Sequence, residues 1–92
     1  MSGQGGADSR ISISPSFRFQ WEEAQNAFVL LYPEGMVTLN DSAGHILKRC
    51  DGTRTFAEVV ADLRDEFPNA NLEDDVKQFL EIAHERGWIC YE

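Results

Sequence analysis

The stretch that decides the fold is Phe17-Arg18-Phe19-Gln20-Trp21, followed after a polar connection by Ala27-Phe28-Val29-Leu30-Leu31-Tyr32. The first segment alternates apolar and polar residues and places its three aromatic side chains on one face, which is typical of a β-strand. The second segment is apolar on both faces, as is typical of the central strand of a sheet. Together they predict two neighbouring strands, over residues 17–21 and 27–32.

A third strand is predicted directly after them, over residues 36–39. Tyr32-Pro33-Glu34-Gly35 fits a tight turn, because proline fixes φ at the second position and glycine suits the fourth. This strand leads straight into a helix that begins at Asn40 or Asp41, so its outer edge has no partner. An unpaired edge can accept an extended peptide as a further strand.

Three helices are predicted after the strands. The first covers about residues 41–50 and is ended by Gly52, and Gly44 inside it costs about 1 kcal/mol relative to alanine. A close approach of helix and sheet is one explanation for that glycine. The second opens with the capping box of Thr55 and Glu58 and stops at Pro68, and the third is capped by Asn71 and closed by Gly87. Residues 88–91 are expected to pack on the core as a short extended tail.

The expected fold class is therefore α+β: a three-stranded antiparallel meander followed by a three-helix bundle. The second and third helices have the shape of a helix-turn-helix with the meander as its wing, although here the strands come first. Residues 1–14 are rich in Gly and Ser and are expected to be a disordered tail, which leaves residues 15–92 as a single domain. A monomer is expected, with a dimer as the alternative, since the central strand has two apolar faces.

The charge balance argues against nucleic acid. Eight Lys and Arg against sixteen Asp and Glu give a formal net charge of −8, and the basic residues are scattered along the chain. A nucleic-acid-binding protein concentrates Lys and Arg on one face. A winged-helix DNA-binding protein is thus the alternative on shape alone. No segment resembles a signal peptide or a membrane span, so a cytoplasmic protein without membrane contact is expected.

No catalytic constellation is found, so the chain is not expected to be an enzyme. Cys50 and Cys90 are far apart and are expected to be free thiols. His45 and His84 show no metal-ligand spacing, and no Gly-rich phosphate loop or iron–sulfur cysteine cluster is present. We therefore predict no metal and no cofactor.

The ordered region resembles the pyrroloquinoline quinone (PQQ) biosynthesis protein D (PqqD) family. The resemblance is carried by residues 17–25, by Leu30-Leu31-Tyr32-Pro33-Glu34-Gly35, by Cys50-Asp51-Gly52 and by Arg86-Gly87-Trp88-Ile89. It implies a peptide chaperone that binds the precursor peptide PqqA and presents it to the radical S-adenosylmethionine (SAM) enzyme PqqE. Such recognition elements serve many systems that modify ribosomally made peptides.

The resemblance also implies where the peptide binds: beside the third strand and against the third helix. On the strand, Val37 and Leu39 point to one face and Met36 and Thr38 to the other. Alternation predicts that one of these two pairs meets the core and the other is partly exposed. On the helix, the sequence leaves open whether the flank of Asp75, Ile82 and Arg86 or that of Lys77, Leu80 and His84 faces the peptide. The predicted peptide-binding residues are Met36, Val37, Thr38, Leu39, Asp75, Val76, Phe79, Ile82 and Arg86.

Overall fold

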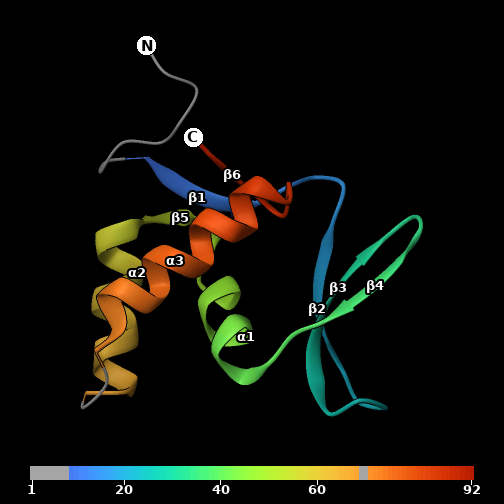
Figure 1. Ribbon diagram of the computed structural model, residues 1–92, viewed down its shortest axis with the longest axis horizontal. Helices are drawn as coiled ribbons and strands as arrows, with labels where there is room; N and C mark the ends of the chain where they lie inside the picture. The colour runs from blue at the N-terminus through green and yellow to red at the C-terminus, as the bar shows by residue number, and fades with distance from the viewer. Residues whose placement is uncertain (1–8, 69–70) are drawn as a thin grey trace.

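The computed structural model describes residues 9–68 and 71–92, and within them the chain forms six strands and three helices (Figure 1). The α+β class is thus confirmed. In chain order the elements are β1 (Arg10–Ile13), β2 (Arg18–Glu22), β3 (Ala27–Tyr32), β4 (Gly35–Thr38), α1 (Asp41–Lys48), β5 (Asp51–Thr55), α2 (Phe56–Glu66), α3 (Leu72–Glu85) and β6 (Ile89–Tyr91).

The first sheet has the strand order β2-β3-β4, and both strand pairs are antiparallel. These are the three strands that the sequence predicts, with boundaries shifted by one residue in β2 and β4. Tyr32 pairs with Gly35 across a two-residue turn, as the Pro33-Glu34 pattern indicates. Figure 1 shows this sheet on one side of the molecule and α2 and α3 on the other, with α1 between them.

A second antiparallel sheet, with the order β5-β1-β6, corrects the predicted architecture. Its central strand, β1, lies inside the segment that was predicted to be a disordered tail. Ile11 is 0% exposed there, and it pairs with Tyr91 near the other end of the chain. A four-residue strand whose partners lie far away in sequence has no local signal beyond its Ile-Ser-Ile alternation. The domain therefore begins before residue 15, while residues 1–8 lie outside the described part.

The helix boundaries follow the predicted signals in part. The capping box of Thr55 and Glu58 is formed, and Asn40 Oδ1 accepts a 2.8 Å hydrogen bond from the Ala43 N–H. Asn71 occupies the N-cap position of α3 as predicted, but its side chain makes no capping hydrogen bond. Gly52 has a positive φ of 87°, but it lies in β5, whereas α1 ends at Lys48 with Arg49 as its C-cap. The prediction that Gly52 ends the first helix was therefore wrong.

The core joins both sheets to the helices. Its largest fully buried side chains include Ile11 of β1, Leu30 of β3, Leu47 of α1, Leu80 of α3 and Ile89 of β6. Burying each such side chain contributes about 1.5–3 kcal/mol to the free energy of folding. The two sheets therefore pack on one shared core within the described part of the chain.

Arg49 joins α1 to α2 from a buried position, 8% exposed. Its Nε donates to Asp62, one terminal nitrogen donates to Glu66, and the other donates to the His45 carbonyl oxygen at 2.8 Å. Burial alone would lower the pKa of Arg49, but the hydrogen bonds and charges of the two carboxylates outweigh it and raise that pKa. The guanidinium thus stays charged inside the fold because its donors are satisfied.

Candidate functional site

The β4 strand is an edge strand of its sheet, and its backbone exposes hydrogen-bonding groups on one side. The Leu39 N–H donates to the Phe28 carbonyl oxygen at 2.9 Å. Val37, two residues before Leu39, pairs with Leu30 in the same ladder. Bonded and non-bonded pairs alternate in an antiparallel ladder, so the N–H and C=O of Val37 also point toward β3. Those of Met36 and Thr38 therefore point outward, away from the sheet.

The side chains of β4 alternate as the sequence predicts. Val37 is partly buried against the core, and Leu39, just beyond the strand, is 6% exposed. Met36 is 39% exposed and Thr38 is also exposed, on the opposite face. The Gln25 side chain lies over that face, since Thr38 Oγ1 donates to Gln25 Oε1 at 2.6 Å and Gln25 Nε2 lies 3.7 Å from Met36 Sδ.

On α3, the predicted residues divide between the core and the surface. Val76 is 1% exposed and Phe79 packs partly buried against the core, whereas Asp75 is exposed and Ile82 is 47% exposed. The Arg86 guanidinium lies 5.6 Å from the Trp88 ring centre, within the range of a cation–π contact. Phe79 lies beside the same ring, with the two ring centres 6.4 Å apart.

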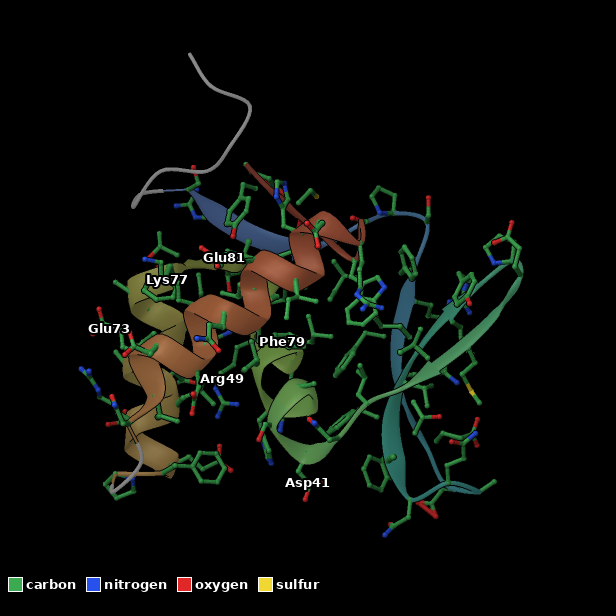
Figure 2. The ribbon with its side chains drawn as sticks, viewed as in Figure 1. Asp41, Arg49, Glu73, Lys77, Phe79 and Glu81 are labelled. Atoms are coloured by element: carbon green, nitrogen blue, oxygen red, sulfur yellow. The ribbon has the colours of Figure 1, made fainter. Side chains whose placement is uncertain are left out.

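The two flanks of α3 have different surroundings. Figure 2 shows Phe79 on the side of α3 that faces α1, and Lys77 and Glu81 on the opposite side. His84 packs on Tyr91 of β6 with ring centres 5.1 Å apart, and Leu80 is 2% exposed. The flank of Lys77, Leu80 and His84 is thus turned toward the second sheet, whereas Asp75 on the other flank lies near residues of α1.

A cavity of about 310 Å³ lies where α1, the end of α2 and the start of α3 meet. We call it the helix cavity. It unites the predicted residues Asp75 and Val76 with residues that the sequence did not single out. The one feature of the sequence that could have pointed to this cavity is Phe67, an apolar residue directly before Pro68, which stops the helix. The helix cavity is lined by Asp41, Ser42, His45, Ile46, Leu63, Phe67, Leu72, Asp75 and Val76.

The predicted residues come from two elements, β4 of the first sheet and α3. Of the nine, Asp75 and Val76 line the helix cavity. Val37 and Phe79 pack against the same core from these two directions. Met36 and Ile82 are two of the four large apolar side chains that the described part exposes, together with Trp21 and Phe67.

The two cysteines and the metal-ligating residue types offer no second site in the described part of the chain. Cys50 and Cys90 are free thiols, and burial raises the pKa of the Cys50 thiol to about 12. Among residues 9–68 and 71–92, no group of three or more His, Cys, Asp and Glu could hold a metal ion. Over the same ranges, none of the helices is both long and apolar enough for a membrane crossing.

What the described part offers is a free strand edge and exposed apolar side chains, which define a binding domain.

Comparison with known proteins gives the family. The model of the family described as coenzyme PQQ synthesis protein D (PqqD) matches residues 27–89. A PqqA binding protein of Azotobacter vinelandii is 62% identical over 74 residues, which are 79% of this chain and 80% of that protein. The chain therefore belongs to the PqqD family. Its relatives are named as binding proteins, so the prediction of a non-enzyme is confirmed.

Solved structures agree with this assignment. The PqqD truncation of Methylobacterium extorquens PqqCD is 26% identical, with a TM-score of 0.68 over 97% of this chain and 94% of that one. It is described as a stand-alone recognition element for ribosomally synthesized and post-translationally modified peptides. The heterocyclase TruD has a TM-score of 0.71 at 20% identity, covering 91% of this chain and 12% of TruD, and so shares the fold.

Proposed function

We propose that this chain binds the precursor peptide PqqA as an added strand on β4 and presents it for modification. The observation that carries the proposal is the outward direction of the Met36 and Thr38 backbone groups on an edge strand. The names of its relatives support the identity of the peptide. Strand addition takes affinity from main-chain hydrogen bonds and specificity from side-chain contacts.

The short edge limits what the main chain can supply. Two outward residues, Met36 and Thr38, offer four hydrogen-bonding groups. Their net contribution to the free energy of peptide binding is on the order of 2–6 kcal/mol. Association costs a comparable amount in lost translational and rotational freedom. Stable binding therefore also needs apolar contact, and the exposed Met36 and Ile82 side chains are suited to supply it.

Presentation requires a second partner, for which we propose the radical SAM enzyme PqqE. A module that holds the peptide while the enzyme acts needs a separate docking surface for the enzyme. Saturating PqqA should thus leave PqqE binding intact, and competition between them would contradict presentation. A cytoplasmic, monomeric protein is part of the same proposal.

Amide exchange tests the placement of the peptide. In the free protein the Met36 and Thr38 amides point outward and should exchange fast, while those of Val37 and Leu39 are bonded to β3 and should exchange slowly. Added PqqA should slow Met36 and Thr38 selectively. New protection confined to β2, the opposite edge, would place the peptide elsewhere.

A pair of proline substitutions tests the mechanism. Thr38→Pro removes an outward N–H and should keep the fold while weakening PqqA binding by about 1–3 kcal/mol more than Thr38→Ala does. Val37→Pro removes an inward N–H and should lower the melting temperature. Equal PqqA affinities for the folded Thr38→Pro and Thr38→Ala proteins would rule out strand addition here. Duplex DNA at low salt serves as the control ligand and should not bind.

A further inference from the structure

We infer that the helix cavity binds the side chain of one Lys or Arg residue of the peptide that lies on β4. The inference rests on the proposed function and adds the chemistry of a specific subsite to it. Three features of the cavity support this assignment: its apolar interior, the two charges at its rim and its position at the end of β4.

The interior of the cavity is apolar. Its buried lining side chains are Ile46, Leu63 and Val76, which are between 1% and 6% exposed. Phe67, 37% exposed, packs edge-on against the His45 ring with 5.1 Å between ring centres. A volume of about 310 Å³ is at the lower end of the range for ligand pockets, so it suits a single long side chain.

The rim of the cavity is acidic. Asp41 and Asp75 are both exposed and both line it, and within residues 9–68 and 71–92 neither makes an ion pair. Four other acidic residues do form ion pairs with arginine: Asp51, Asp62, Glu66 and Glu73. A Lys or Arg side chain matches this arrangement, because its methylene stem packs on apolar surface while its charged group stays at the rim.

The location connects the cavity to the peptide edge. Thr38 ends β4, and Asp41 at the rim follows it by only three residues. A strand paired with β4 that continues past Thr38 thus runs toward the rim, at about 3.3 Å per residue. The net charge of −8 also favours a cationic ligand through the long-range field.

The test compares the two aspartates at the rim with Asp74, a neighbouring aspartate that does not line the cavity. Asp74 and Asp75 both lie in the first turn of α3, where either charge stabilises the helix dipole, but only Asp75 lines the cavity. PqqA affinity is measured for the wild type, Asp74→Asn and the double variant Asp41→Asn/Asp75→Asn, at low and high NaCl. Circular dichroism confirms the fold of each protein. The double variant should bind PqqA about tenfold more weakly at low salt, and Asp74→Asn should bind like the wild type.

A set of PqqA variants identifies the bound residue. Each Lys and Arg of PqqA is replaced in turn by Gln, and one replacement should weaken binding to the wild type but have no effect on the double variant. If the double variant binds like Asp74→Asn while Thr38→Pro still weakens binding, the subsite is wrong and the strand mechanism stands. If wild-type protein does not bind PqqA at all, the proposed function fails and the inference fails with it.

Discussion

Gly44 of α1 lies so close to Phe28 of β3 that a Cβ atom built on the glycine would be 2.6 Å from Phe28 Cδ2. The Cβ and Cγ atoms of Phe28 would both be 3.2 Å away, so more than the far end of a flexible side chain is involved. Phe28 in turn stacks on Phe19 with 4.9 Å between ring centres. The absence of a side chain at Gly44 thus sets how closely α1 approaches the first sheet.

This contact predicts the effect of Gly44→Ala. Helix propensity alone would stabilise the protein by about 1 kcal/mol, but overpacking against Phe28 should cost about 1–3 kcal/mol. We expect net destabilisation in urea unfolding. In a Phe28→Ala background, the same substitution should become neutral or stabilising. Destabilisation of equal size in both backgrounds would contradict a direct clash.

The burial of Ile11 predicts that β1 is needed for folding. Ile11→Ala should lower the free energy of unfolding by about 2–5 kcal/mol, because it leaves a cavity in the shared core. Arg10→Ala, at the exposed neighbouring position, serves as the matched control and should change it by less than about 0.5 kcal/mol. A chain that begins at residue 15 should not fold cooperatively. A normal melting transition for that chain would contradict a structural role of β1.

The Arg49 contacts predict a non-additive pair of substitutions. Asp62→Asn and Glu66→Gln should each cost less than about 1 kcal/mol, because one carboxylate still neutralises the guanidinium. The double variant leaves a buried charge without an anionic partner and should cost clearly more than the sum of the single variants. Strict additivity in urea unfolding would show that Arg49 is solvated well enough to need neither partner. Arg49→Lys should be destabilising, since one ammonium cannot reproduce the fork of donors.

The buried Cys50 thiol predicts an alkaline loss of stability. Its pKa is raised from about 9 to about 12 in the folded protein, so the unfolded chain loses this proton first as the pH rises. The contribution of Cys50 to the free energy of unfolding is therefore constant below about pH 9. It falls between about pH 9 and 12, by up to 1.4 kcal/mol per pH unit. Cys50→Ala should remove this part of the pH dependence, measured as urea midpoints from pH 8 to 10.5.

The same burial predicts different thiol reactivities. In native protein at pH 8, a thiol reagent should label the half-buried Cys90 quickly and Cys50 only when the protein unfolds. The Cys90→Ser variant isolates the slow thiol. Rapid labelling of Cys50 in that variant would contradict its burial.

The sequence by itself determined the elements whose signals are local. The alternation of residues 17–21, the turn at Pro33 and the capping box of Thr55 each involve neighbours in the chain, and the structure contains all three. The β4 edge strand was predictable for the same reason, since a turn and a helix bound it. The family motifs extended this to a binding role.

The tertiary structure alone decided what depends on distant partners. β1 pairs with strands about 40 and 80 positions away, and no local pattern specifies such partners. The surroundings of the two flanks of α3 depend on where α1 and β6 pack, and the helix cavity exists only because three helix ends converge. Periodicity fixes which residues share a face, but the packing of whole elements decides what each face meets.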